Sequence, residues 1–359
     1  MQRLMWQSTV IGIINPDYSV DFTENVSKMP RTFHVLKNQK WTRQDFERFL
    51  VDRIPSRNRR DIEMLLARMH LYEYDIFDIA EKTHAVNVRD LFWLGNQGDT
   101  FNNCFQKLSK HLFLDTSDYQ KRIYMTPEGQ NVKDYGVYHG SYGIIKKRLS
   151  PLLTDVESEV AVYRLFREWG IPCCHAVQID KDKVFSQFSY RFGIEYLVHF
   201  RTLLAMTQIP KGYSLLNQIM AVRPEFFASY VQMLVGDFLT RQEDRHTSNF
   251  AIVAYNGKEH FYPLYDNGRS LFYESTIQDI EDAVGDIEKY SAFFGQSDTY
   301  YKAIIEIAKE RPDVLSRVIT GIKLDRIGEI LDNSFISGYR KNGVVEWMRK
   351  GLIFLNSLI

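Results

Sequence analysis

Two acidic residues and one asparagine have the types and the spacing that phosphoryl transfer requires. Asp244 and Asn249 lie five residues apart, in a segment that follows an apolar repeat with helical spacing. Asp266 comes after two β-rich runs joined by Asn256-Gly257, a dipeptide that strongly favours a hairpin turn. Such a hairpin returns Asp266 to the neighbourhood of Asn249. One carboxylate could then accept the proton of an attacking hydroxyl, while the asparagine oxygen and the second carboxylate hold Mg²⁺.

Each of these three residues, taken alone, is also typical of an ordinary turn or cap. Their combination is more specific, because the spacing from Asp to Asn matches that of a kinase catalytic loop and the hairpin supplies the second carboxylate. Hard oxygen ligands also suit Mg²⁺ and do not suit zinc. The pattern therefore favours a phosphotransferase site over three unrelated turns.

Two segments around these residues resemble the HipA-like kinase family. They are GDFLTRQEDRHTSNFAIV and PLYDNGRSLF. The family pattern is a helix, then Asp-Arg-His-x-x-Asn-Phe, a hairpin, and an aromatic-Asp metal motif. The resemblance implies that Asp244 is the catalytic base and that Asn249 and Asp266 are Mg²⁺ ligands. It also implies that His246 supports the catalytic loop.

The resemblance extends upstream to a lysine and a glutamate. YGIIKKRLS is similar to the strand that carries the phosphate-binding lysine, and SEVAVYRLFREWGIP is similar to the family's glutamate-bearing helix. The resemblance implies that Lys146 pairs with Glu159. Lys147 and Glu157 are the alternative candidates for these two roles. Successive side chains of a strand face opposite sides, so only one of the two lysines can enter the site. Glu157 is expected to form a capping box with Thr154.

Two further segments are assigned to nucleotide binding by the same resemblance. MTPEGQNVKDYGVY is similar to the family's phosphate-covering loop, and FSQF falls where the adenine-binding hinge is expected. Glycine allows the backbone to approach a phosphate closely. The residues implied to bind nucleotide are Gly129, Gln130, Asn131, Lys133, Phe185, Gln187 and Phe188.

The expected fold class is α+β, a bilobal protein-kinase-like fold of the HipA-like type with an N-terminal, mainly helical extension. Residues 1–115 form the accessory region, residues 116–188 the N-lobe and residues 189–359 the helical C-lobe. In the N-lobe we expect hairpins at 134–147, turning at Gly140-Ser141, and at 176–188, with a helix from Thr154 to about Trp169 between them.

The accessory region has two interpretations. After one strand at Thr9–Ile14, helices are expected at 43–52, 59–69, 76–82 and 88–94. The pattern of Ile76–Leu91 is typical of a helix-turn-helix, and four arginines precede it: Arg57, Arg59, Arg60 and Arg68. Four acidic residues oppose that interpretation: Asp75, Asp78, Glu81 and Asp90. A helical module packed on the kinase is therefore favoured over direct DNA binding.

Composition limits the partners and the compartment. Lys and Arg total 45, and so do Asp and Glu, so the net charge disfavours bulk nucleic acid or an anionic membrane as main partner. No window approaches about 18 consecutive apolar residues, and no signal segment is visible. Three cysteines, Cys104, Cys173 and Cys174, do not form a disulfide framework. We expect a cytoplasmic protein.

The function that the resemblance implies is a serine/threonine kinase with ATP and Mg²⁺ as cofactors. The expected acceptor is a Ser or Thr of a protein substrate, with the kinase itself as an alternative. An antitoxin-like partner protein is also implied. Two other functions stay open: a degenerate kinase that senses nucleotide or binds a partner without catalysis, and a small-molecule phosphotransferase.

Overall fold

The computed structural model describes most of the 359-residue chain. The described residues are 2–37, 39–59, 62–87, 89–106, 133–191, 195–207, 215–255, 258–291, 293–294 and 298–359. The chain divides into two compact units. The first unit comprises Met1–Ile145, Tyr190–Ile209 and Ile252–His260, and the second comprises Lys146–Ser189, Pro210–Ala251 and Phe261–Ile359.

A five-stranded antiparallel sheet organises the start of the first unit. Its strands lie in the order β4-β3-β2-β1-β5. Their bounds are β1 Arg3–Trp6, β2 Thr9–Ile14, β3 Val20–Phe22, β4 Lys40–Trp41 and β5 Phe92–Gly95. Between and after these strands come η1 Glu24–Lys28, η2 Arg31–Leu36, α1 Arg43–Val51, α2 Ile62–Arg68, α3 Ile76–Lys82 and η3 Asn102–Gln106. The expectation of a mainly helical region with one strand therefore missed a sheet.

The segment expected to be a helix at 88–94 contains β5 instead. β5 pairs antiparallel with β1, with Arg3 opposite Gly95 and Trp6 opposite Phe92. All four of its residues are buried, so no alternation of apolar and polar residues marks it as a strand. Because β5 replaces the second helix, the helix-turn-helix interpretation is wrong.

A buried ion pair holds the beginning of β5 to the end of α1. Arg53 donates to both carboxylate oxygens of Asp90 at 2.6 Å, and it also donates to the carbonyl oxygens of Ala85 and Phe92. The aromatic rings of Trp6, Phe33 and Phe92 lie within 5.0 Å of one another, centroid to centroid, beside this pair. These tertiary contacts override the helical preference that the local sequence of residues 88–94 indicates.

The rest of the first unit supplies hairpins and one helix. The elements are β6 Lys133–Tyr138, β7 Ser141–Lys147, β10 Tyr196–His199, α6 Phe200–Thr207, β11 Ala251–Tyr255 and β12 Lys258–Phe261. β10, β11 and β12 form a three-stranded sheet in that order. His139 and Gly140, both with positive φ, make the turn between β6 and β7, one residue earlier than expected. The last two residues of β7, Lys146 and Lys147, already belong to the second unit.

The second unit is mostly helical. It contains α5 Asp155–Glu168, β8 Ala176–Asp180, β9 Lys183–Gln187, α7 Leu215–Val222, η5 Pro224–Phe226, α8 Phe227–Thr240, α9 Ile277–Gly285, α10 Ile287–Tyr290, β13 Phe293–Phe294, β14 Asp298–Thr299, α11 Tyr300–Glu310, α12 Pro312–Thr320, α13 Ile327–Asp332 and α14 Gly338–Asn356. β8 pairs antiparallel with β9, and β13 with β14.

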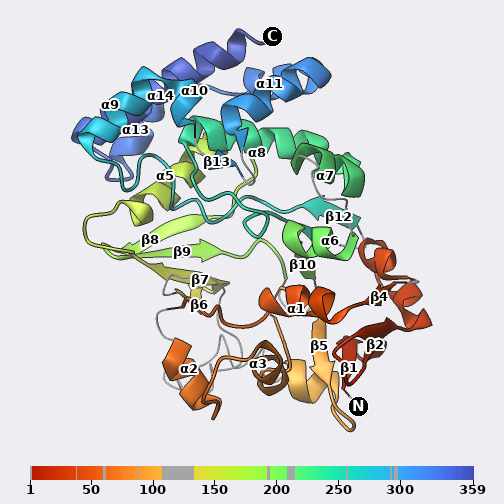
Figure 1. Ribbon diagram of the computed structural model, residues 1–359. Helices are drawn as coiled ribbons and strands as arrows, with labels where there is room; N and C mark the ends of the chain where they lie inside the picture. The colour runs from red at the N-terminus through yellow and green to blue at the C-terminus, as the bar shows by residue number, and fades with distance from the viewer. Residues whose placement is uncertain are drawn as a thin grey trace. The chain divides into compact units, whose positions relative to one another are not determined.

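Helix α8 is the central element of the second unit, and it contacts α11, α12 and α14 (Figure 1). Nearly all of its side chains are buried, which explains why the sequence repeat is apolar on more than one face. Gly236 faces Phe166 of α5 and Ile171, and a Cβ at this position would lie 2.9 Å from the Phe166 ring. The glycine thus lets α5 and α8 pack closely. Among the described residues, no helix combines the length and apolar character needed to cross a bilayer.

Candidate active site

The loop after α8 is organised around one fully buried guanidinium group. Arg245 forms a two-point ion pair with Asp237 of α8, at 2.8 and 3.0 Å. It also donates to the carbonyl oxygens of Asn249 and Tyr265, at 2.8 and 2.6 Å, and to Asn267 Oδ1 at 2.6 Å. Burial lowers the pKa of Arg245, but Asp237 outweighs this effect, so the guanidinium stays charged. One side chain therefore ties α8 to the segments that carry Asn249 and Asp266.

Short hydrogen bonds fix the three residues on which the sequence analysis depends. The buried side chain of Gln242 accepts from the Asp244 backbone N–H at 2.9 Å and donates to the Asp266 carbonyl oxygen at 3.1 Å. The side-chain amide nitrogen of Asn249 donates to the Asp244 carbonyl oxygen at 2.7 Å. Because that nitrogen is used, the side-chain oxygen of Asn249 is the atom left to face a cation. The structure thus brings Asp244, Asn249 and Asp266 into one network.

Asp266 has a left-handed backbone conformation, with φ of 59°. This conformation is costly for most residues other than glycine, and it persists only where neighbouring contacts impose it. Here both neighbours are held by Arg245, through the Tyr265 carbonyl oxygen and the Asn267 side chain. Asn267 also donates to Cys173 Sγ at 3.4 Å. The network therefore sets the direction of the Asp266 carboxylate.

Lys146 lies between two carboxylates. Its ammonium nitrogen is 2.9 Å from Glu159 Oε2 and 2.9 Å from Asp266 Oδ1. Burial lowers the pKa of Lys146, but Asp266 and Glu159 together raise it above its usual value, so the ammonium is charged. The Glu159 side chain is 2% exposed, whereas that of Asp266 is 30% exposed. A Cβ at Gly268 would lie 3.1 Å from the Asp155 carbonyl oxygen and 3.4 Å from Glu159 Oε2, so this glycine lets the Asp266 segment approach the start of α5 closely.

The expected capping box at the start of α5 is wrong, although the helix begins where expected. Thr154 makes no side-chain cap; instead its backbone N–H donates to the Tyr273 carbonyl oxygen at 3.1 Å. Glu157 pairs instead with Arg148, which donates to both of its carboxylate oxygens, at 2.7 and 2.6 Å. Lys147 is exposed on β7. The structure thus separates both alternative candidates from the pair of Lys146 and Glu159.

The pKa of Asp244 reflects its position between opposing charges. Burial raises this pKa above its usual range, and the Asp266 carboxylate adds to the rise. Arg269, whose guanidinium nitrogen lies 3.7 Å from Asp244 Oδ2, opposes it, as does His246. A carboxylate with a raised pKa is a stronger proton acceptor, which is the property that a general base requires. His246 is exposed, and its Nδ1 accepts from the Ser248 backbone N–H within the same loop.

The remaining residues assigned to nucleotide binding are distributed as follows. Gly129, Gln130 and Asn131 lie outside the described residues. Lys133 begins β6 in the first unit. In the second unit Phe185 is buried in β9 and Phe188 is half-buried just after it. The Gln187 backbone N–H already donates to the His175 carbonyl oxygen at 2.8 Å. The binding roles of these residues stay predictions.

Sequence reasoning did not select Asp237, Gln242, Arg245 or Asn267. One signal could have found the first of them. Asp237 stands alone as a charged residue in an apolar helix, and a buried carboxylate needs a buried partner of opposite charge. Arg241 and Arg245, four and eight residues later, are the nearest candidates beyond the helix end, and Arg245 is the one that pairs with it. The hydrogen-bonding role of Gln242 had no comparable signal.

Comparisons with known proteins give a match at the level of structure. Neither a protein-family model nor a curated protein matches this sequence. HipA of the Shewanella oneidensis MR-1 toxin-antitoxin system, solved with HipB and its operator DNA, is similar with a TM-score of 0.60 at 12% identity, over 99% of this chain and 97% of that one. The chain has a HipA-like fold. The Helicobacter pylori proinflammatory kinase CtkA is similar with a TM-score of 0.52 at 17% identity, over 63% of this chain and 90% of that one.

The first prediction concerns the Arg245 network of the HipA-like fold. Arg245→Met leaves the buried Asp237 charge without a partner and should lower the free energy of unfolding by about 3–5 kcal/mol. Denaturant titration measures this loss. Asp237→Asn in the Arg245→Met background should recover part of it, because the uncompensated charge is then gone.

The matched control is Arg317→Met, because Arg317 pairs with Asp313 on an exposed helix surface. Solvent screens such a pair, so the control should unfold nearly as the parent does. If Arg245→Met behaves like this control, the network does not hold the loop.

Proposed function

We propose that this chain is an ATP- and Mg²⁺-dependent phosphotransferase that transfers the γ-phosphate of ATP to a hydroxyl. The observation that carries the proposal is the position of Lys146, held at 2.9 Å from both Glu159 and Asp266 in a HipA-like kinase fold. An ammonium group fixed in direction by two carboxylates is suited to neutralise phosphate charge. Asp244 and Asn249, in the loop joined to Asp266 through Gln242 and Arg245, supply the other groups that the reaction needs.

The oxygen donors of this site fit Mg²⁺. Asp266 offers a partly exposed carboxylate, and Asn249 offers a side-chain oxygen. Hard oxygen ligands of this kind are those that Mg²⁺ prefers. In the chain itself the Lys146 ammonium lies against Asp266 Oδ1, so a positive charge already suits this position. When bound, Mg²⁺ would neutralise phosphate charge.

Each of the chain's own residues would have a separate role in the reaction. Lys146 orients phosphate oxygens, and Glu159 keeps the ammonium pointing in one direction. The Asp244 carboxylate, whose pKa is raised by burial, would accept the hydroxyl proton of the acceptor. Arg269, beside Asp244, stabilises the ionised carboxylate before the proton arrives.

The proposed acceptor is a Ser or Thr of a protein, the kinase itself included. This part of the proposal is supported by the likeness to CtkA, a proinflammatory kinase, and to HipA. The HipA structure contains HipB and operator DNA. We extend the proposal to an antitoxin-like protein partner for this chain, with DNA reached through that partner.

ATP turnover with and without Mg²⁺ tests the reaction. The wild-type chain should release or transfer phosphate only with Mg²⁺. Asp266→Asn, which tolerates the left-handed backbone but removes the charge, should abolish the Mg²⁺ dependence together with turnover. Asp244→Asn should lower turnover by roughly 10²–10⁴-fold, with little change in nucleotide affinity.

Asp313→Asn, on an exposed helix of the same unit, serves as the matched control and should behave as wild type. Nucleotide binding without any turnover would instead favour a degenerate, nucleotide-sensing kinase. Turnover of Asp266→Asn at the parent rate would contradict the metal assignment.

The second functional prediction separates the two adjacent lysines. Lys146→Ala should sharply weaken ATP binding and turnover, and Glu159→Ala should weaken them less. The double variant should be little worse than Lys146→Ala, because the two residues act as one unit. Isothermal titration with ATP and a turnover assay measure both effects. Lys147→Ala is the internal control, since this side chain is exposed on β7. Loss of activity in Lys147→Ala alone would overturn the assignment.

The third functional prediction concerns pH. If Asp244 must be ionised to accept the proton, turnover should fall as the pH is lowered through its raised pKa. Arg269 holds that pKa down, so Arg269→Gln should raise it and move the acidic limb of the pH–rate profile to higher pH. Arg317→Gln, far along the chain on an exposed surface, should leave the limb in place. A limb that does not move in Arg269→Gln would mean that another group titrates.

A further inference from the structure

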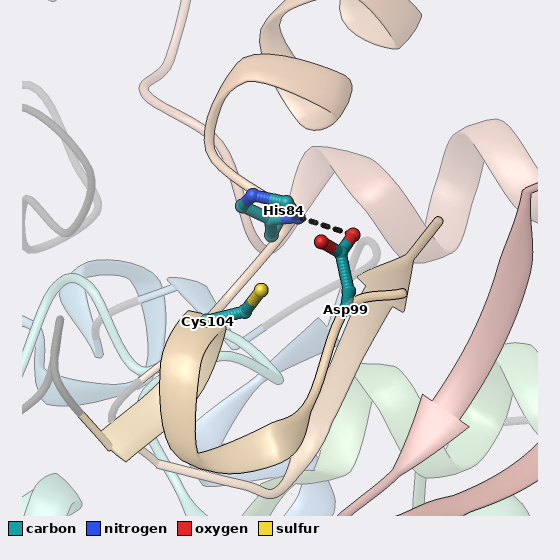
Figure 2. A group of neighbouring side chains, drawn as sticks. All are labelled: His84, Asp99 and Cys104. Atoms are coloured by element: carbon teal, nitrogen blue, oxygen red, sulfur yellow. Dashed lines mark ion pairs between the residues drawn. The ribbon is translucent and has the colours of Figure 1, made fainter. Parts of the chain in front are cut away.

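A second cluster of potential ligands lies in the first unit. A ring nitrogen of His84, a carboxylate oxygen of Asp99 and the Cys104 sulfur all lie within 4.8 Å of one another. Figure 2 shows the three side chains converging from separate segments. His84 Nδ1 lies 3.9 Å from Asp99 Oδ2 and 2.9 Å from the Leu94 carbonyl oxygen. None of these three residues has a role in the proposed phosphotransfer site.

Local structure fixes the direction of each side chain. His84 lies in the turn after α3 with a left-handed backbone, φ of 51°, and its backbone carbonyl accepts from the Leu94 N–H at 2.7 Å. Asp99 closes the turn after β5, where its Oδ2 accepts from the Asn96 backbone N–H at 2.7 Å. Cys104 lies buried in η3, a single π-helical turn. The cluster is therefore held by backbone contacts that do not depend on a metal ion.

We propose that His84, Asp99 and Cys104 form a Zn²⁺-binding site that joins the turn after α3, the turn after β5 and η3. Cysteine sulfur, histidine nitrogen and aspartate oxygen are the three ligand types that zinc accepts together in tetrahedral sites. A thiolate and a carboxylate supply two negative charges, which match the charge of a divalent cation. The sulfur ligand excludes Mg²⁺ and Ca²⁺, which take oxygen donors.

The distances require only a small contraction. Zinc bonds of about 2.0–2.2 Å to nitrogen and oxygen at a tetrahedral angle place these two ligand atoms about 3.4 Å apart. His84 Nδ1 and Asp99 Oδ2 are 3.9 Å apart, so side-chain rotation can close the difference. In the metal-free chain Nδ1–H donates to the Leu94 carbonyl oxygen, so zinc binding at Nδ1 moves the ring proton to Nε2 and replaces that hydrogen bond. The His84 and Asp99 side chains are each about a quarter exposed, which leaves a solvent-facing position for a water molecule as fourth ligand.

The competing interpretation needs no metal. Burial raises the pKa of Cys104 to about 11, and Asp99 adds to the rise, so in the metal-free chain the thiol is protonated and hydrogen-bonded to Asp99. Two interpretations thus predict different partners for the sulfur: a proton in one case and a cation in the other. A metal titration distinguishes them, because only the second includes a metal–thiolate bond.

The experiment is a titration of the tag-free, chelator-treated full chain with Co²⁺ and then Zn²⁺, without nucleotide. We expect one equivalent of Co²⁺ to give the thiolate charge-transfer and tetrahedral ligand-field absorption, and Zn²⁺ to displace it. Cys104→Ser, Asp99→Asn and His84→Asn should each weaken binding by more than about tenfold. Asp99→Asn keeps an acceptor for the Asn96 N–H, and His84→Asn tolerates the left-handed backbone.

The matched control is His70→Asn, because His70 has a similar backbone, φ of 57°, but is exposed and outside the cluster. It should bind Co²⁺ as the parent does. X-ray absorption of the Zn²⁺-loaded wild type needs no variant and should show one sulfur among nitrogen and oxygen ligands. A shell of nitrogen and oxygen alone, a charge-transfer band that survives in Cys104→Ser, or no saturable binding by the wild type would each overturn the proposal.

Discussion

The buried pair between Arg245 and Asp237 is the interaction on which the candidate site depends. Asp237 belongs to α8, the helix at the centre of the second unit, so the guanidinium is anchored to a helix that is almost wholly buried. A lone charge in this position would be costly, but the two groups and three further acceptors satisfy one another. The main effect of the pair is therefore to determine the path of the loop, and its net contribution to the stability of the fold is smaller.

The chief consequence of that anchor is the backbone of Asp266. A left-handed aspartate between two fixed neighbours cannot relax to an extended conformation without breaking contacts to Arg245. The strain is retained at the residue that would hold Mg²⁺ in the proposed function, and functional sites are the usual place for such strain in proteins. The site is thus pre-organised by groups that never contact the substrate in the proposed reaction.

The sequence predicted much of this arrangement, for identifiable reasons. α8 and the residues Asp244, Asn249 and Lys146 carry strong local signals: an apolar repeat, a fixed spacing and an alternating strand. β5 could not be predicted, because a wholly buried strand shows no alternation. The predicted α5 capping box is absent because Arg148, nine residues before Glu157, binds that carboxylate instead. Local patterns thus predicted the residues of the candidate site, whereas the partners that hold them, such as Asp237 for Arg245, depend on how separate elements meet.

Two carboxylates of the proposed site share one positive charge, but they differ in their exposure to solvent. Glu159 is almost wholly buried and pairs with Lys146, whereas Asp266 is partly exposed and shares that lysine. A cation arriving from solvent therefore meets Asp266 and not Glu159. In the proposed function, Asp266 would hold Mg²⁺, which would supply positive charge beside the phosphates. The buried Glu159 would keep the Lys146 ammonium in its direction, so the lysine could donate its remaining hydrogens to a phosphate.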